Sequence, residues 1–145
     1  MKKYCLVSAL MNDESLKKLN TILGIKYNII YHNPNGGKIE KFTDEEIENA
    51  EIIIGNPSAE TLKKCKKLKW LQLNSSGADF YAKSGIIDPK ATVLTNATGA
   101  YGHAIAEYLL AAVFMITKKL HLYRDNQFAG KWQDLGAVGT IKGSN

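Results

Sequence analysis

A run of small polar residues after an apolar segment offers the first candidate for chemistry in this sequence. In WLQLNSSGADF at 70–80, the apolar residues end at Leu73 and Asn-Ser-Ser-Gly follows. A turn through Ser75, Ser76 and Gly77 can aim successive backbone N–H groups outward, which suits a carboxylate or a phosphate, and glycine permits close approach to the backbone. The alternative is a plain turn in which Ser75 or Ser76 caps the next helix. On these residues alone, the plain turn is the favoured interpretation.

A second loop opens the helical stretch in the last third of the sequence. In TNATGAYGHAIAE at 95–107, Gly99 and Gly102 give half of a dinucleotide fingerprint, but the first glycine of the motif is missing. The segment is therefore a weak phosphate loop. GGK at 36–38 is weaker still, because His32 stands where a Walker loop needs glycine and Ile39 where it needs serine or threonine.

The titratable residues form no recognisable catalytic or metal-binding set. No pair of histidines or carboxylates has metal-ligand spacing, so no metal is expected. His103 lies at the start of a helical stretch, where the dipole disfavours its charged form, and a surface or capping role is favoured over a pocket. His32 and His121 are expected to be structural or exposed. Glu107 lies in apolar sequence, where a buried carboxylate needs a partner, so an interface ion pair is favoured over catalysis.

Composition indicates a globular protein with a real core. The 145 residues suffice for one domain, and 45% are hydrophobic and 23% charged. No apolar run is long enough to predict a membrane span, and the N-terminus predicts a strand rather than a signal peptide. Cys5 and Cys65 belong to no metal or redox motif, which favours reduced thiols in the cytoplasm. The net charge of +5 permits an anionic partner, but the basic run at 62–69 is interpreted as a solvated face rather than a nucleic-acid site.

Short β-rich runs alternate with helical stretches through the first hundred residues. Thr43 and Glu46 form a capping-box pattern at the start of one predicted helix, and Leu16, Leu19, Ile22 and Leu23 share one face of another. This alternation predicts an α/β fold with an open, doubly wound parallel sheet of about five strands and helices on both faces. Strands are expected at 4–10, 26–32, 51–55, 69–74 and 91–96, helices at 13–24, 43–50 and 58–68, and a loop at 33–37.

The last third predicts one long helix over 103–127. From Ala104 to Ile116 it is apolar on nearly every side. A helix of this kind must be buried all round, so it is expected to pack against a second domain or another subunit. The tail that follows is expected to be weakly structured and to be anchored by Trp132.

Together, the two loop-bearing segments resemble one family. LKWLQLNSSGADF followed by TVLTNATGAYGHAIAEYLLAAVFMITKKLHLYRDNQFAGKW is similar to the D-isomer-specific 2-hydroxyacid dehydrogenases. The resemblance implies a flavodoxin-like substrate (catalytic) domain over 1–100. It also implies an interdomain helix and arm over 101–145 that lead to a Rossmann-type NAD-binding domain, and a homodimer through the helix at 103–121. The sequence is expected to be truncated before that Rossmann core.

The resemblance also implies a reaction, the transfer of a hydride between NAD or NADP and a D-2-hydroxy acid or 2-keto acid. It assigns Ser75, Ser76, Gly77 and Tyr101 to substrate binding, and Ser76 and Tyr101 to cofactor contact as well. The catalytic Arg, Glu and His of the family lie downstream, so no catalytic residue is assigned, and the isolated chain is expected to be inactive. No nucleic acid or membrane partner is implied. The alternative from another class is a stand-alone flavodoxin-like binding or interaction module without catalysis.

Overall fold

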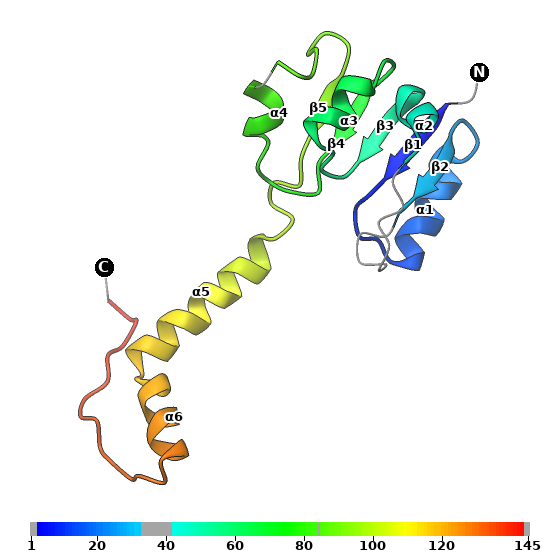
Figure 1. Cartoon of the computed structure of the whole chain (residues 1–145). Helices are drawn as coiled ribbons and strands as arrows, with labels where there is room; N and C mark the ends of the chain where they lie inside the picture. The colour runs from blue at the N-terminus through cyan, green and yellow to red at the C-terminus, as the bar shows by residue number, and fades with distance from the viewer. Residues whose placement is uncertain (1–2, 33–41, 84, 144–145) are drawn as a thin grey trace. The chain divides into compact units, whose positions relative to one another are not determined.

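The computed structural model describes residues 3–32, 42–83 and 85–143, and the chain divides into two compact units, Met1–Thr98 and Gly99–Asn145. The loop expected at 33–37 and GGK at 36–38 lie outside the described residues. The first unit is built on one parallel sheet (Figure 1). Its strands are β1 (Tyr4–Val7), β2 (Asn28–Tyr31), β3 (Ala50–Ile54), β4 (Trp70–Gln72) and β5 (Val93–Thr95).

The strand order is β2-β1-β3-β4-β5, which is the flavodoxin-like order, and every pairing is parallel. The predicted fold class is therefore confirmed. Every residue of β1 and β3 is buried, as expected for central parallel strands that are covered on both faces. All five strands are shorter than or equal in length to the predicted runs, because the sequence runs include residues that continue past the ladder into the loops.

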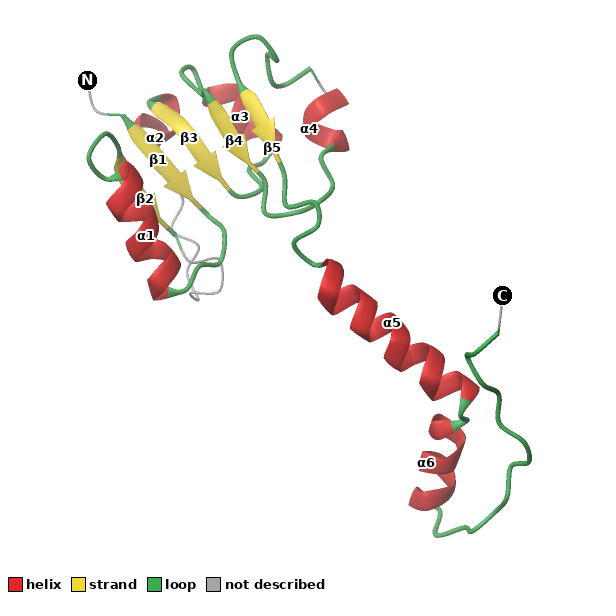
Figure 2. Ribbon diagram, turned by 180° about the vertical axis from the view of Figure 1, so that it is seen from behind, coloured by secondary structure: helices red, strands yellow, loops and turns green. Residues whose placement is uncertain are grey.

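Helices cover both faces of the sheet, unequally. Alternate strand residues form two apolar clusters, since successive side chains point to opposite faces. One face is covered by α1 (Asp13–Leu23), which lies in front of the sheet in Figure 2. The other is covered by α2 (Asp44–Glu48), α3 (Ala59–Lys64) and α4 (Asp79–Lys83), which contribute Ile47, Leu62 and Tyr81 to its core.

Side-chain caps start these helices where the sequence predicts. Thr43 and Glu46 make both hydrogen bonds of the capping box, and Ser58 caps α3 by accepting from the N–H of Thr61 at 3.2 Å. The predicted apolar face of α1 is correct only in part. Leu19 and Leu23 pack on the sheet, whereas Ile22 is 73% exposed.

A buried carboxylate organises the amino end of β3. Glu51 is 7% exposed. It receives ion pairs from Lys3 at 3.4 Å and Lys69 at 3.2 Å, and the hydroxyl of Tyr27 donates to it at 3.2 Å. Burial by itself raises the pKa of Glu51. The hydrogen bonds and positive charges of Lys69 and Lys3 lower this pKa by a larger amount, so the net shift is downward.

The lysines of the basic run pair with the acidic segment of α2 and β3. Lys64 contacts Asp44 at 2.6 Å, and Lys66 contacts Glu48 at 2.9 Å. With Lys69 on Glu51, three lysines of the run are therefore used within the fold. The helix expected over 58–68 is too long, because Cys65 is extended (ψ 105°) and α3 ends at Lys64, so Lys66 and Lys69 follow the helix. The interpretation of the run as a solvated face rather than a nucleic-acid site stays a prediction.

The second unit contains two helices, so the prediction of a single helix over 103–127 is wrong. α5 (Gly102–Thr117) and α6 (Leu120–Phe128) are separated at Lys119, whose φ of 56° is left-handed. The ammonium of Lys118 donates to the carbonyl of Gly139 at 2.6 Å, and that of Lys119 donates to the carbonyl of Leu135. Carbonyl groups of the tail thus accept hydrogen bonds from the two lysines at the break. The sequence 103–127 contains no glycine or proline that would have predicted this break.

Within this unit the apolar surface of α5 is open. Trp132 is fully exposed, so the expected anchoring by its indole is wrong for the described chain, and Glu107 and His103 are exposed too. No helix in residues 3–32, 42–83 and 85–143 is both long and apolar enough to cross a membrane. The large apolar side chains of α5 that are at least 43% exposed are Ile105, Tyr108, Leu109, Leu110, Val113, Phe114, Met115 and Ile116.

Candidate functional site

The carboxyl ends of the parallel strands are where an open α/β sheet binds ligands. Backbone hydrogen bonds continue between the strands up to this edge. The N–H of Gly55 donates to the carbonyl of Gln72 at 2.8 Å, and the N–H of Leu73 donates to that of Thr95 at 2.8 Å. The loops after β3, β4 and β5 therefore start from strand ends that are hydrogen-bonded to one another.

The segments that follow β1 and β3, where the strand order reverses, approach each other closely at Ser8 and Gly55. Gly55 follows β3 with a φ of +140°, a conformation reserved for glycine. A Cβ at this position would lie 2.1 Å from the hydroxyl oxygen of Ser8 and 3.3 Å from its carbonyl carbon. Ser8 and Gly55 therefore pack directly against each other, with no room for a side chain at position 55.

In the loop after β4, the carbonyls of Ser75 and Ser76 both accept hydrogen bonds from the loop after β5. The N–H of Ala97 donates to the carbonyl of Ser75 at 3.0 Å, and the side-chain amide of Asn96 donates to the carbonyl of Ser76 at 2.8 Å. In a trans peptide the C=O and the following N–H point in opposite directions. The N–H groups of Ser76 and Gly77 therefore point away from the β5 loop, both to the same side.

These two N–H groups are open to an acceptor. Within the described part of the chain, no hydrogen bond uses the N–H of Ser76 or of Gly77, and both residues are exposed. Adjacent N–H groups on one side form a nest that attracts an anion. The segment from Leu73 to Ala78 carries no charged side chain, so backbone dipoles would supply the attraction.

Gly77 leaves the approach to this nest clear. A Cβ built on it would meet no atom within 4 Å, and its φ is not positive. The fold therefore does not require glycine here, and any benefit of glycine must come from what approaches the loop.

The capping alternative for the serines is wrong. α4 begins at Asp79, and the carbonyl of Ala78 accepts the first hydrogen bonds of the helix, from Tyr81 and Ala82. The hydroxyl of Ser75 instead donates to the carbonyl of Gly77 at 3.1 Å. This bond closes the loop on itself and leaves the backbone N–H groups unused.

Sequence reasoning missed Asn96, the residue that joins the two loops. Its amide oxygen also accepts from the N–H of Thr98 at 3.2 Å, an Asx turn. A signal was present, because in the sequence an asparagine follows four of the five strands within two residues, at Asn33, Asn56, Asn74 and Asn96. The N–H of Asn74 donates to the side-chain oxygen of Asn56 at 3.2 Å, a bond between the β3 and β4 loops that ends before Ser76 and Gly77.

Tyr101 lies in the second unit, immediately before α5. It is 54% exposed, and its side chain makes no capping hydrogen bond to the helix. Its assignment to substrate and cofactor contact stays a prediction, as do those of Ser75, Ser76 and Gly77.

Other reactive groups of the described chain offer no competing chemistry. Burial raises the pKa of both Cys5 and Cys65 to about 11, so neither thiol forms a nucleophilic thiolate near neutral pH. The part of the chain that the structure describes holds no group of three or more His, Cys, Asp or Glu side chains arranged for a metal ion.

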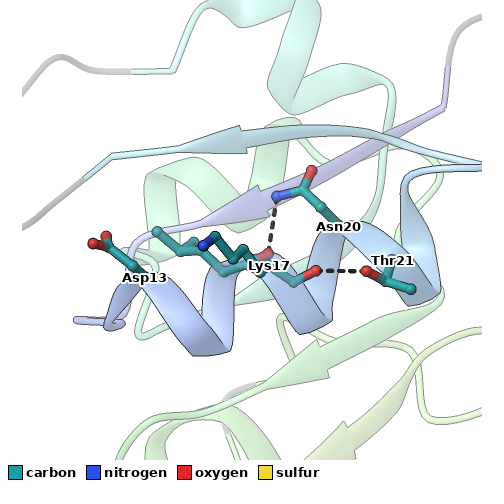
Figure 3. Close-up of a pocket in the computed structure, with 5 residues that line it drawn as sticks. Asp13, Lys17, Asn20 and Thr21 are labelled. Carbon is teal, nitrogen blue, oxygen red and sulfur yellow. Dashed lines mark hydrogen bonds between the residues drawn. The ribbon is translucent and has the colours of Figure 1, made fainter.

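A shallow hollow runs along the outside of α1 (Figure 3). Two of its four polar side chains are bonded to the helix that carries them: the amide of Asn20 donates to the carbonyl of Leu16, and the hydroxyl of Thr21 donates to that of Lys17, both at 2.9 Å. The other two polar side chains, Asp13 and Lys17, carry opposite charges, and every lining residue comes from α1.

Known structures share this fold over nearly the whole chain. A D-isomer-specific 2-hydroxyacid dehydrogenase family protein from Aeromonas salmonicida matches with a TM-score of 0.73 and 22% identity, over 96% of this chain and 43% of its own. A D-isomer-specific 2-hydroxyacid dehydrogenase from Xanthobacter autotrophicus, solved with NADPH and MES, matches with a TM-score of 0.60 and 14% identity, over 94% of this chain and 42% of its own.

A third solved structure is an acyclic imino acid reductase in complex with NADPH and D-arginine. It matches with a TM-score of 0.66 and 17% identity, over 94% of this chain and 45% of its own. The chain thus spans less than half the length of all three proteins. These solved structures confirm the resemblance at the level of the fold, which is what identities of 14–22% establish. No protein-family model and no curated protein sequence matches the chain.

Proposed function

We propose that this chain is the substrate-binding part of an NAD(P)-dependent oxidoreductase that acts on D-2-hydroxy acids and their 2-keto acids. The observation that carries the proposal is the pair of outward N–H groups of Ser76 and Gly77, created by the two held carbonyls. A 2-keto acid presents a carboxylate, and the nest suits that group. The fold similarity to D-isomer-specific 2-hydroxyacid dehydrogenases supports the same assignment.

In this proposal the chain binds the carboxylate of the substrate and orients its carbonyl carbon. The N–H groups of Ser76 and Gly77 hold the carboxylate, and Ser75 keeps the loop closed through its bond to Gly77. Fixing the carboxylate fixes the direction of the adjacent carbonyl carbon, and orientation of this kind lowers the barrier of a bimolecular step. Tyr101 is proposed to contact the substrate as well. Because no catalytic residue is assigned, we expect no dehydrogenase activity from the 145 residues alone.

NAD or NADP is proposed as the cofactor of the whole enzyme, since two of the similar structures contain NADPH. The described residues do not fit its pyrophosphate by themselves. The segment after β1 is Ser8-Ala9-Leu10 and has no glycine, whereas a dinucleotide loop needs glycines to bring backbone N–H groups to the phosphates. Contacts from Ser76 and Tyr101 would be auxiliary, and the main cofactor site would lie in another part of the protein.

A homodimer through 103–121 is proposed from the open surface of α5. Eight large apolar side chains are exposed on this one helix within its unit. Contiguous apolar surface of this kind marks a protein–protein contact. The same surface argues against the alternative of a stand-alone module, because a self-sufficient monomer would be expected to cover it.

Binding to the chain itself tests the proposed function. The ¹⁵N-labelled chain would be titrated with pyruvate and followed by the amide resonances of Ser76 and Gly77, with pyruvamide, which lacks the carboxylate, as the control ligand. We expect saturable shifts of these two amides with pyruvate only. Equal shifts with pyruvamide, or no shift with either ligand, would contradict the proposal.

A substitution at Gly77 provides the matched protein control. A Cβ at this position would meet no atom within 4 Å, so we expect the spectrum outside the loop to be unchanged. Its side chain would cover the nest, and we expect pyruvate binding to weaken at least about tenfold, the loss of one or two hydrogen bonds to a charged group. Binding by Gly77→Val as tight as that of the unsubstituted chain would mean that the loop is only a turn.

A further inference from the structure

We propose that Asn96 is a positioning residue of the carboxylate site: its side-chain amide holds the Ser76–Gly77 peptide in the one orientation that presents an N–H group to the ligand. This inference rests on the proposed function, because it explains how the nest keeps its shape. Asn96 does not touch the ligand in this arrangement. It acts through the carbonyl of Ser76, 2.8 Å from its amide nitrogen.

The Ser76–Gly77 peptide needs this hydrogen bond because Gly77 allows the peptide to rotate. A peptide unit can flip by rotation about the two bonds on either side of it, and glycine accepts both the original and the flipped backbone conformation. The loop residues Ser76 and Gly77 are exposed, and no atom lies near the Cβ position of Gly77 to block the rotation. A flipped peptide would aim the carbonyl oxygen of Ser76 at the carboxylate and replace an attraction with a repulsion.

Only an amide of this length makes both bonds of Asn96. Its nitrogen donates to the carbonyl of Ser76, while its oxygen accepts from the N–H of Thr98 at 3.2 Å. The second bond fixes the side chain within its own loop, so that the first bond acts as a strut between the two loops. Aspartate would keep the acceptor and lose the donor, and alanine would lose both.

The neighbouring bond from Ala97 does not make Asn96 redundant. The N–H of Ala97 holds the carbonyl of Ser75, which orients the N–H of Ser76. The N–H of Gly77 belongs to the next peptide, and the bond from Asn96 is the one that holds its carbonyl. Loss of Asn96 should therefore affect the amide of Gly77 more than that of Ser76.

Two substitutions and one control test this role in the ¹⁵N-labelled chain. Asn96→Ala removes both bonds, and Asn96→Asp removes only the bond to Ser76. Asn56→Ala is the matched control, because it removes an exposed amide from the same edge of the sheet. The bond of that amide ends at Asn74, before Ser76 and Gly77, which would hold the ligand. The measurements are the pyruvate dissociation constant and microsecond–millisecond exchange at the amide of Gly77 without ligand.

We expect both Asn96 variants to bind pyruvate about three- to tenfold more weakly, the equivalent of one hydrogen bond, and to show exchange broadening at Gly77. Asn56→Ala should bind within about twofold of the unsubstituted chain and show no broadening. Equal weakening by Asn56→Ala would overturn the positioning role in favour of general loosening of the loops, and tight binding by Asn96→Asp would overturn it directly.

The ligand-free measurement separates this inference from the proposed function. If the unsubstituted chain does not bind pyruvate, the proposed function fails. Exchange at Gly77 in the Asn96 variants alone would then still support the positioning of the peptide. If the unsubstituted chain binds pyruvate and the Asn96 variants match it in both measurements, the inference about Asn96 fails and the proposed function stands.

Discussion

The hydroxyl of Thr95 donates a 2.6 Å hydrogen bond to the side-chain oxygen of Gln72. These are the last residues of β5 and β4, and they are register partners in the sheet. The same hydroxyl accepts from the indole N–H of Trp70 at 2.8 Å. Side chains thus tie the two strands together immediately before the loops that form the candidate site.

Replacement of Thr95 by valine should destabilise the first unit by about 1–2 kcal/mol, because the partly buried side chains of Gln72 and Trp70 would each lose a partner. Urea unfolding measures the effect. Thr21→Val is the matched control, since its exposed hydroxyl bonds only to the carbonyl of Lys17 on its own helix, and it should change stability by less than about 0.5 kcal/mol. Equal effects of both substitutions would argue against the strand-tying role.

Two glycines at the same edge of the sheet should differ in how much a substitution by alanine destabilises the chain. Gly55→Ala should destabilise the chain by about 2–4 kcal/mol, because its φ of +140° strains any side chain and the new Cβ would crowd Ser8. Gly77→Ala should change the free energy of unfolding by no more than about 0.5 kcal/mol, since no atom lies near the new Cβ. Thermal and urea unfolding of both variants provide the comparison. A stable Gly55→Ala variant would mean that Ser8 and Gly55 do not pack as closely as described.

The ion network of Glu51 should make stability depend on pH. Because the folded pKa of Glu51 is lowered, the ionised carboxylate stabilises the fold above its unfolded pKa, and this contribution is lost as pH falls through the folded pKa. Glu51→Gln should therefore cost about 1–2 kcal/mol near neutral pH, a figure reduced for the partly exposed lysines. The difference from the unsubstituted chain should shrink toward zero in acid.

Urea unfolding at several pH values measures this difference. Glu48→Gln serves as the control, because its ion pair with Lys66 is solvent-exposed and should contribute less than about 0.5 kcal/mol at any pH. A constant cost for Glu51→Gln across the whole range would show that shape, and not charge, is what Glu51 contributes.

Charged residues on α5 should prevent the proposed dimer. Ile105 and Leu109 lie one helical turn apart and are 56% and 57% exposed. Replacing both with glutamate places charges in the apolar contact, and sedimentation velocity should then detect a monomer at concentrations where the unsubstituted chain is a dimer. Ile22→Glu on α1, where the side chain is 73% exposed, should leave the dimer intact. A monomeric unsubstituted chain would refute the dimer itself.

Local signals in the sequence predicted the fold well. The apolar run Ile52–Ile54 predicted a buried parallel strand, and the capping box at Thr43 predicted the start of α2, because both depend on residues close together in the chain. The break at Lys119 could not be predicted this way. It coincides with contacts from Lys118 and Lys119 to tail residues 21 and 16 positions further along the chain, and those contacts have no signature in the helix sequence.

The sequence predicted where the candidate site lies, but not the hydrogen bonds that orient it. The polar turn at Ser75-Ser76-Gly77 was visible as an abrupt end of apolar residues after a strand. Its orientation depends on Asn96, which reaches it only because β4 and β5 are neighbours in register. A hydrogen bond between two loops is a property of strand order, and one sequence does not reveal strand order residue by residue.

The place of Glu51 has a consequence for how this protein can change over generations. Glu51 lies at the amino end of β3, whereas the polar loops follow the carboxyl ends of the strands. Three or four residues of strand separate the two ends, about 10–13 Å at 3.3 Å per residue, which is at least one Debye length at physiological salt. Substitutions that retune ligand choice at the loops therefore need not disturb the charges that hold the other end together, and the two traits can drift independently.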